Sequence, residues 1–462
     1  MSEDAKLSDF ANREGGESTK NEGIIRPTSW GKIPSEWDEK TISEVTELVT
    51  DGSHNPPKRV EDGIQLLSGQ NIQNGYIDFN KEPSYISPSD FEQMDNNHSI
   101  QKGDLLLTIV GSIGRSAVVD GKTDFALQRS IALLRTNDEV TTPFLKFVTD
   151  SERFHRQADS RSRATAQGGL YLEALNKINL PVPSLPEQRK IATVLYTVDR
   201  AIEKTEEIID RNQTLKNGIR QDIFQHGGLS GENTVSQRIG PKEYEMPEDW
   251  DVVSLSQVAE INGGQGFKSS NYVDEGVPLI KISNVQNGYL DLQDTSYLPE
   301  EYLDEYNEVA LSKGDVVLVL TRPIIGDGIK AARINRDDRF LLNQRLAVVD
   351  PLDEDTILRE YLYHLIFTNV FIDQVKATVR ATHQPNLSKT DLQNFSIPIP
   401  EIEQQRNICR VLRSVEDTVE KNKSYRAHLK RIKRGLMQDL LSGKVRTTDT
   451  NMQVPDKITQ HG

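Results

Sequence analysis

Apolar residues recur with the period of a helix in two long segments that contain no proline, residues 187–225 and 404–442. In the first segment, the heptad core positions fall on Ile191, Leu195, Val198, Ile202, Thr205, Ile209, Asn212, Leu215, Ile219 and Ile223. In the second they fall on Ile408, Leu412, Val415, Val419, Asn422, Tyr425, Leu429, Ile432, Leu436 and Leu440. Each segment, about 39 residues long, makes roughly 58 Å of helix. A stripe this long is typical of a coiled-coil seam, so we expect the two helices to pair.

Shorter apolar runs, separated by turn residues, precede each helical segment. Between Trp30 and Pro183 the runs at 65–67, 105–110 and 131–134 resemble strands, and residues 143–156 have a helical pattern. Asn74-Gly75 and Asn287-Gly288 stand between apolar flanks and predict tight hairpin turns. The pattern therefore predicts an α+β domain with a mixed or antiparallel sheet, followed by a long helix.

The second half of the chain repeats the first. Residues 71–78 return as residues 284–291 with six identities in eight positions, and further matches lie at offsets between 211 and 217. These include Lys102-Gly103-Asp104 with Lys313-Gly314-Asp315, and Gln128-Arg129 with Gln344-Arg345. A period of about 215 residues is too long for a solenoid, so the chain is a tandem duplication of a whole domain. A protein with two diverged copies of one domain is expected to recognise two related targets.

These patterns define the expected domain boundaries. We expect a disordered N-terminus at 1–26, a first globular domain at 27–184, a central helical spacer at 185–227, a linker at 228–240, a second globular domain at 241–401, a C-terminal helical spacer at 402–445, and a disordered tail at 446–462. Duplicated units commonly pack about a pseudo-two-fold axis. The helices would then be antiparallel, with the globular domains at opposite ends of one rod. Thr205 and Asn422 are equivalent polar seam positions that either fix the register of the helices or are merely tolerated there.

Composition narrows the class of protein. No apolar run approaches the length of a membrane span, and the polar N-terminus lacks a signal-peptide core. The single cysteine, Cys409, excludes internal disulfides and indicates a cytoplasmic protein, in which it fills space in a helix. The net charge of −15 by itself argues against binding to nucleic acid. The distribution of charge weakens this argument, because basic residues cluster at 153–163 and 426–434. Charge therefore leaves DNA binding open.

The chain shows no catalytic or metal-binding motif. Asn55-Pro56-Pro57 resembles the loop of adenine methyltransferases in which an aromatic residue follows, but here Lys58 follows. The glycine-rich residues 263–266 lack the strand and helix that a phosphate-binding loop requires, and we interpret them as flexible backbone. The eight histidines have no metal-ligand spacing. Gly103-Asp104 and Gly314-Asp315 are interpreted as structural turns before buried strands.

Polar side chains suited to DNA recognition concentrate on the predicted loops of both copies. Asn and Gln pair with adenine edges, Arg pairs with guanine edges, and Ser and Thr bind phosphate. Taken singly, each of these residues could instead be an ordinary polar loop residue with no role in DNA binding. The candidates in the first copy are Ser53, His54, Lys58, Gln70, Asn71, Gln73, Asn74, Gln128, Arg129, Arg161, Arg163, Thr165 and Gln167. Those in the second copy are Lys281, Asn284, Gln286, Asn287, Arg322, Gln344, Arg345, Arg380, Thr382 and Gln384.

In this layout the chain resembles the specificity subunits of type I restriction-modification systems from Pro34 to Lys444. The resemblance rests on the loop 51–54, the Lys-Gly-Asp turns, and the Pro-x-Pro elements that lead into Glu187-Gln188-Arg189 and Gln404-Gln405-Arg406. It implies that each globular domain is a target-recognition domain for half of a bipartite DNA site. It further implies that the helices pair as an antiparallel coiled coil, set the spacing and dock two methyltransferase (modification) subunits, which restriction subunits then join. S-adenosylmethionine, ATP and Mg would be used by those partners, with no cofactor bound by this chain. The second copy departs from the pattern at residues 263–266, which read Gly-Gly-Gln-Gly where residues 51–54 read Asp-Gly-Ser-His, so the resemblance implies no contacts for that loop.

Two other classes of function remain open. A stand-alone DNA-modifying enzyme would need catalytic motifs that the sequence does not contain. A non-catalytic scaffold without DNA affinity would require the Gln, Asn and Arg loops to be purely structural.

Overall fold

The computed structural model describes residues 25–55, 57–95, 99–163, 168–226, 233–381, 385–448 and 450–459. The chain forms two compact units, which we describe separately: unit 1 comprises residues 1–204 and 425–462, and unit 2 comprises residues 205–424. Most of the expected disordered N-terminus, and residues 228–232 of the expected linker, lie outside the described residues.

Unit 1 is an α+β domain whose strands form small antiparallel and mixed sheets, as predicted. The main sheet has the strand order β4-β10-β7-β8 and is antiparallel, while a second sheet, β6-β5-β9, pairs β5 and β9 in parallel. The elements of unit 1 that precede the long helix are β1 (Ile25–Pro27), β2 (Lys32–Pro34), β3 (Asp38–Thr41), α2 (Ile42–Val45), β4 (Thr46–Asp51), β5 (Ile64–Leu67), β6 (Tyr85–Ile86), α3 (Pro88–Asp95), β7 (Leu105–Thr108), β8 (Ser116–Val118), β9 (Phe125–Leu127), β10 (Ile131–Thr136), α4 (Thr142–Thr149), α5 (Glu152–Ser162), α6 (Leu172–Asn176) and β11 (Asn179–Val182).

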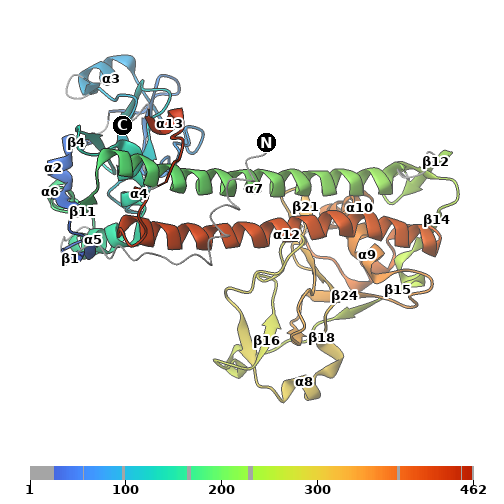
Figure 1. Cartoon of the computed structure of the whole chain (residues 1–462). Helices are drawn as coiled ribbons and strands as arrows, with labels where there is room; N and C mark the ends of the chain where they lie inside the picture. The colour runs from blue at the N-terminus through green and yellow to red at the C-terminus, as the bar shows by residue number, and fades with distance from the viewer. Residues whose placement is uncertain are drawn as a thin grey trace. The chain divides into compact units, whose positions relative to one another are not determined.

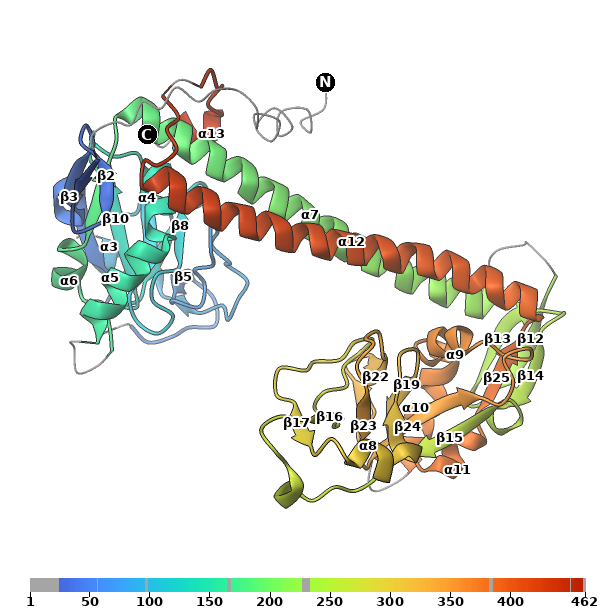
Figure 2. The ribbon, with the colours of Figure 1, turned by 60° about the horizontal axis from the view of Figure 1, so that its bottom comes forward.

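Unit 2 repeats this architecture. The sheets β15-β24-β19-β22 and β17-β16-β23-β18 correspond to the two sheets of unit 1. Figure 2 shows the strands of the first of these sheets next to one another. The elements are β12 (Thr234–Ile239), β13 (Lys242–Pro247), β14 (Asp251–Ser254), β15 (Ala259–Gly263), β16 (Val277–Ile280), β17 (Ser296–Leu298), α8 (Tyr302–Glu305), β18 (Ala310–Leu311), β19 (Val316–Val319), β20 (Ile324–Ile325), β21 (Gly328–Ile329), β22 (Ala331–Arg333), β23 (Phe340–Leu342), β24 (Leu346–Pro351), α9 (Arg359–Ile366), α10 (Asn369–Ala381), α11 (Lys389–Gln393) and β25 (Ser396–Ile399), with short 3-10 turns at 255–257, 269–271 and 307–309. The predicted duplication of an α+β domain is confirmed.

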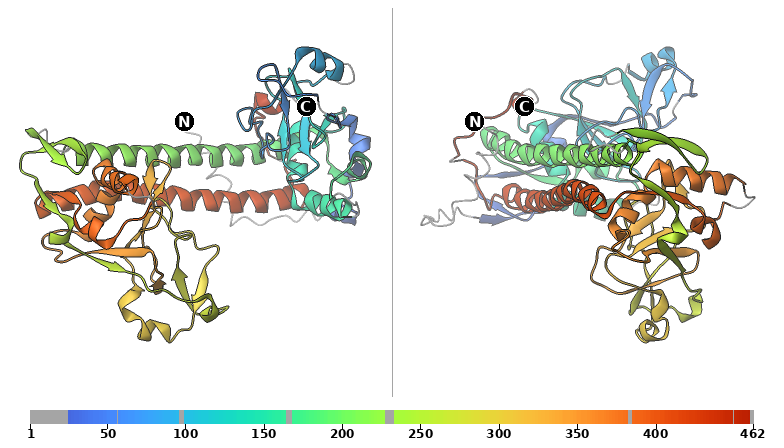
Figure 3. Two further views of the ribbon diagram at one scale, coloured as in Figure 1. Left: turned by 180° about the vertical axis from the view of Figure 1, so that it is seen from behind. Right: turned by 90° about the vertical axis from the view of Figure 1, so that its right-hand side faces the viewer.

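The two long helices, α7 (Leu185–His226) and α12 (Ile402–Leu441), pair within each unit. In unit 1, Ile191 and Leu195 share a core with Met437 and Leu440, and further along α7 Val198 and Ile202 pack with Leu429. Advancing along α7 therefore moves backwards along α12, which defines an antiparallel pair; Figures 1 and 3 show the two helices side by side. In unit 2 the same holds, because Ile223 and Phe224 pack with Ile408 and Leu412 while Lys216 contacts Glu416.

The heptad seam predicted from the sequence is wrong at three positions. The side chains of Leu215, Tyr425 and Ile432 are 52%, 50% and 38% exposed, although each was assigned to the seam. A straight α-helix has 3.6 residues per turn, so positions spaced by 3.5 residues drift off the buried face within a few heptads.

Equivalent ion pairs link the helices inside each unit. Lys433 lies 2.6 Å from Asp199 in unit 1, and Lys216 lies 3.4 Å from Glu416 in unit 2, at positions related by the repeat offset of 217. Asn422, by contrast, donates its amide to the carbonyl of Thr418 in its own helix. We therefore attribute the alignment of the two helices to the ion pairs between them and not to Asn422.

Two segments at the expected domain boundaries differ from the sequence expectation. The expected tail contains a short helix, α13 (Asp456–Thr459), whose Ile458 is buried in the unit 1 core, and Arg446 contacts the buried Glu187 at 2.7 Å. Part of the expected linker forms β12, which pairs with β13 as a hairpin. The tail is ordered by contacts with residues far away in the sequence, and β12 is ordered by pairing with the adjacent strand β13. The polar composition of the two segments reveals neither interaction. Among the described residues, no helix is long and apolar enough to cross a membrane.

Candidate DNA-recognition surface

Asn71 and Asn284, two of the candidates, hold the repeated turns together. In each copy the side-chain oxygen accepts a backbone N–H three residues earlier, at 2.8 Å for Asn71 and 2.9 Å for Asn284. Each amide nitrogen donates to a backbone carbonyl seven residues later, at 3.0 and 2.9 Å. Both side chains are almost fully buried. They are therefore occupied in the fold and are not available to bind DNA.

Loops that follow four strands meet at one edge of unit 1. Ser53, after β4, donates its N–H to Leu127, and Gln128, after β9, donates its N–H to Leu67 at the end of β5. Ile109, after β7, donates its N–H to the carbonyl of Ser130. We call the loops 52–54, 68–70, 109–115 and 128–130 the loop edge of unit 1. The structure therefore brings together the candidates Ser53, Gln70, Gln128 and Arg129.

The loop edge requires a glycine at one point in each unit. A Cβ on Gly52 would lie 2.1 Å from the carbonyl oxygen of Leu127, and one on Gly264 would lie 2.1 Å from that of Asn343. Ser53 and Gln265, the next residues, form parallel bridges with Gln128 and Asn343. The residues 263–266 are therefore not merely flexible backbone, because they occupy the same close approach as residues 51–54.

The sequence match of Gln128-Arg129 with Gln344-Arg345 is out of register by one residue. Arg129 donates its N–H to Ser53, whereas Gln344 donates its N–H to Gln265, the counterpart of Ser53. Arg129 is therefore equivalent to Gln344, and Ser130 is equivalent to Arg345. An identical dipeptide one position away from the true alignment produced the error.

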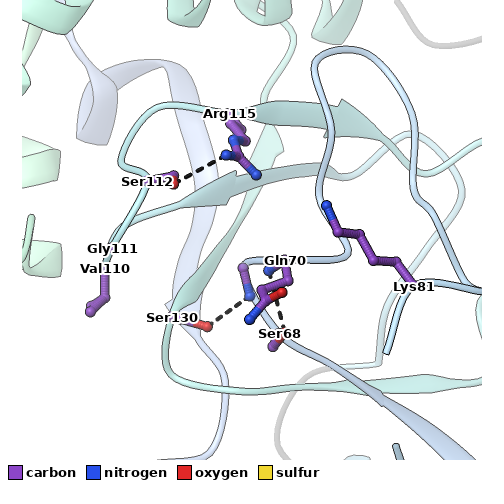
Figure 4. Close-up of a pocket in the computed structure, with 9 residues that line it drawn as sticks. Ser68, Gln70, Lys81, Val110, Gly111, Ser112, Arg115 and Ser130 are labelled. Carbon is purple, nitrogen blue, oxygen red and sulfur yellow. Dashed lines mark hydrogen bonds between the residues drawn. The ribbon is translucent and has the colours of Figure 1, made fainter. Parts of the chain in front are cut away.

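A pocket of ≈ 460 Å³ opens at the loop edge of unit 1, as Figure 4 shows. Hydroxyl, amide and two cationic side chains are among the residues that line it: Ser68, Gly69, Gln70, Lys81, Val110, Gly111, Ser112, Arg115 and Ser130. Arg115 donates to the hydroxyl of Ser112 at 3.1 Å, and Gly69 donates its N–H to the hydroxyl of Ser130 at 3.0 Å. Hydroxyl, amide and cationic groups at one place suit the phosphates and base edges of DNA.

Unit 2 carries cationic side chains at three positions where unit 1 has small uncharged residues. Lys281 replaces Ser68, since both donate their N–H to the turn asparagine. Arg345 replaces Ser130, because its carbonyl accepts from Leu320 as that of Ser130 accepts from Ile109. Arg322 replaces Gly111, and both have positive φ. The loops 264–266, 281–283, 320–330 and 343–345 form the loop edge of unit 2. The same scaffold therefore presents different chemistry in the two units.

The remaining candidates lie elsewhere or are committed to local contacts. Gln73 and Gln286 donate to the carbonyls of Gln70 and Ser283, while Asn74 and Asn287 are exposed on the turns. His54 is exposed and contacts Asp51 at 3.0 Å, and Arg161 donates to the carbonyls of Gln157 and Lys177. Lys58, Arg163 and Arg380 are exposed. Thr165, Gln167, Thr382 and Gln384 lie outside the described residues, as does Pro56 of the Asn-Pro-Pro sequence.

Sequence reasoning missed the five other pocket residues with polar or charged side chains besides Gln70: Ser68, Lys81, Ser112, Arg115 and Ser130. The available signal was the glycine- and serine-rich segment 111–115, which begins three residues after the end of the buried strand β7. Polar residues next to the end of a buried strand lie at the same sheet edge as residues next to its neighbouring strands, and a comparison of matching dipeptides does not reveal this proximity.

The described residues contain no group of three or more His, Cys, Asp or Glu side chains that could hold a metal ion. Cys409 is buried in the core of unit 2, and its burial raises the pKa of the thiol to about 12. A thiol with so high a pKa is not a nucleophile at neutral pH. The structure agrees with a packing role for Cys409.

Comparisons with known proteins define the family. The family model for the type I restriction modification DNA specificity domain matches residues 34–211 and 247–431. The chain is 27% identical to the MjaVIII type I specificity subunit of Methanocaldococcus jannaschii, over 91% of this chain and 95% of that protein. It is 24% identical to the EcoKI specificity subunit of Escherichia coli K12, over 85% of each. In fold it is similar to the crystal structure of a type I S subunit from M. genitalium, with a TM-score of 0.50 and 14% identity over 87% of this chain and 96% of that one.

The matched regions cover both halves of the chain, and each contains one loop edge. The chain therefore belongs to the type I restriction modification DNA specificity family. It is a DNA-specificity subunit with two target-recognition domains, and the subunit itself is non-catalytic.

Proposed function

We propose that the two units recognise the two different halves of an asymmetric, bipartite DNA site through their loop edges. The observation that carries this proposal is that one scaffold occurs twice with different side chains at matching positions. Equal backbones would approach DNA in the same way, while Ser68, Gly111 and Ser130 in one unit and Lys281, Arg322 and Arg345 in the other would select different bases. The candidates Arg129 and Gln344, at equivalent positions, belong to the proposed surface.

We propose that the paired helices set the spacing between the half-sites. The equivalent ion pairs Lys433–Asp199 and Lys216–Glu416 support this role, because they oppose sliding of one helix along the other. We also propose that two methyltransferase subunits and restriction subunits complete the complex in the cytoplasm. S-adenosylmethionine, ATP and Mg would serve those partners.

Exposed apolar residues on the helices suggest where the two methyltransferase subunits dock. Ile208 and Leu215 are 43% and 52% exposed on α7, and lie seven residues apart on one helical face. Tyr425 and Ile432, 50% and 38% exposed, are their equivalents on α12 at the repeat offset of 217. Two copies of the same apolar pair suit two copies of the same partner.

Replacing Ile208 and Leu215 together by serine is therefore expected to leave a complex with one methyltransferase subunit instead of two. Loss of two aliphatic side chains that docking would bury is expected to weaken docking by about 3 kcal/mol. Mass photometry of the reconstituted complex measures the stoichiometry, and Gln213→Ser, an exposed change on the same helix, is the control. Retention of both subunits when Tyr425 and Ile432 are also replaced would place docking elsewhere.

The purified chain alone is expected to transfer no methyl group to DNA and to make no cut, because its sequence contains no cofactor-loop or catalytic motif. In addition, the described residues contain no group of side chains that could hold a metal ion. Incubation with labelled S-adenosylmethionine and DNA measures this. Incorporation above that of a heat-inactivated sample would contradict the assignment as a recognition subunit.

A further inference from the structure

The loop edge of unit 2 holds two arginines in an uncommon backbone conformation. Among the described residues, only three that are not glycine have positive φ, and two of them are Arg322, at 50°, and Arg345, at 70°. Side chains with a Cβ are strained in this left-handed region, and such residues persist where the surrounding structure holds them, often at functional sites.

Backbone hydrogen bonds fix both arginines at the same sheet edge. Arg322 donates its N–H to Pro385 at 2.8 Å, and the carbonyl of Arg345 accepts from Leu320 at 2.9 Å. Leu320 directly follows β19, and Arg345 directly precedes β24, the neighbouring strand. Both arginines are exposed, and hydrogen bonds hold the backbone from which their side chains extend. Rigid placement is what bidentate recognition requires.

The equivalent positions in unit 1 show that the fold does not need arginine there. Gly111 takes the left-handed position of Arg322, and a Cβ on it would meet nothing within 4 Å. Ser130 stands in place of Arg345, and Figure 4 shows both residues at the pocket. The position of Gly111 therefore has room for a side chain, and at both positions the fold accepts different residues in the two units.

A third pair of positions provides the contrast. Arg115 in unit 1 and Lys330 in unit 2 are equivalent, because their carbonyls accept from Thr108 and Val319. A cation present in both units suits the phosphate backbone, which is common to every site. Cations present in one unit only suit a feature that differs between the half-sites, namely the bases.

We propose that Arg322 and Arg345 are specificity-determining residues that bind guanine in the half-site of unit 2. Guanine presents two acceptors, O6 and N7, in the major groove, and the arginine fork donates to both. This inference rests on the proposed function, since it assumes that unit 2 contacts DNA at its loop edge.

The test uses the full chain assembled with its methyltransferase subunits, and methylome sequencing of cells that express each variant. Arg322→Gln and Arg345→Gln are each expected to relax a guanine position in one half of the motif by roughly 5- to 150-fold, and to leave the other half unchanged. Arg322→Lys keeps the charge but loses the fork, and is expected to behave like Arg322→Gln. Lys330→Gln, the control, is expected to reduce methylation at all sites to the same degree.

Arg322→Gly separates recognition from folding. It removes the strained Cβ, so the melting temperature is expected to rise by about 2–4 °C while the guanine preference is lost. The assignment of the arginines would be overturned if the variants of Arg322 and Arg345 retained the guanine preference in the half-site of unit 2. It would also be overturned if they weakened methylation at all sites uniformly, as is expected for Lys330→Gln. A wild-type complex that methylates no bipartite site would instead overturn the proposed function, and this inference with it.

Discussion

The Gly264→Ala variant is expected to lose recognition of one half-site and to be destabilised by about 3 kcal/mol. The new Cβ would lie 2.1 Å from the backbone carbonyl oxygen of Asn343, which cannot move without shifting the loop 343–345. Gly52→Ala would meet the carbonyl of Leu127 at the same distance, and is expected to abolish recognition of the other half-site. For units of this size the melting temperature should fall by about 6–12 °C.

Gly263→Ala is the matched control for this effect. Gly263 ends β15 directly before Gly264, and a Cβ on it would meet nothing within 4 Å. Alanine there is expected to be neutral or to stabilise by about 0.5 kcal/mol, since it restricts the unfolded chain. Thermal unfolding of the three variants, measured by calorimetry, tests the close approach of the two loops. Equal melting temperatures for Gly263→Ala and Gly264→Ala would contradict it.

Insertion of one heptad into both long helices is expected to lengthen the unread spacer of the DNA site and to leave both half-sites unaltered. Seven residues add about 10 Å of helix, which corresponds to about three base pairs. The insertions belong after Lys204 and after Ser424, where the chain passes from one unit to the other, so that neither core is altered. The methylated motif of cells carrying the variant gives the spacer length directly.

Insertion into one helix alone is the control for the spacer experiment. It would move Lys433 away from Asp199, or Lys216 away from Glu416, and is expected to prevent assembly of an active complex. An unchanged spacer in the double insertion would contradict the role of the helices in setting the distance.

Features fixed by local chemistry could be predicted from the sequence. The Asn-Gly turns form because glycine at 75 and 288 takes positive φ, and the Lys-Gly-Asp turns place Gly103 and Gly314 in the same region. Asp104 accepts the N–H of Gln101 there, as a structural turn requires. The duplication, the α+β class and the two long helices follow from periodicity and self-similarity, which need no knowledge of partners.

Features that depend on partners distant in sequence could not be predicted. The role of Asn71 as a buried clamp depends on carbonyls at Asp78 and Lys81, which the residue type does not reveal. The alignment of Arg129 with Gln344 depends on hydrogen bonds to another loop. The exposure of Leu215 depends on how far the heptad positions have rotated away from the buried face of the helix at that point. Candidate site residues chosen by type alone therefore included both clamps and surface groups.

The central claim, that each unit recognises one half of the DNA site, is tested most directly by methylome sequencing of three strains. These carry the methyltransferase and restriction subunits with the wild-type chain, with Arg129→Ala, or with Gln344→Ala, two changes at equivalent positions of the loop edges. The wild-type chain is expected to give an asymmetric, bipartite motif with an unread spacer, and each variant is expected to relax a different half. A contiguous motif, or both halves relaxing together in either variant, would contradict the account.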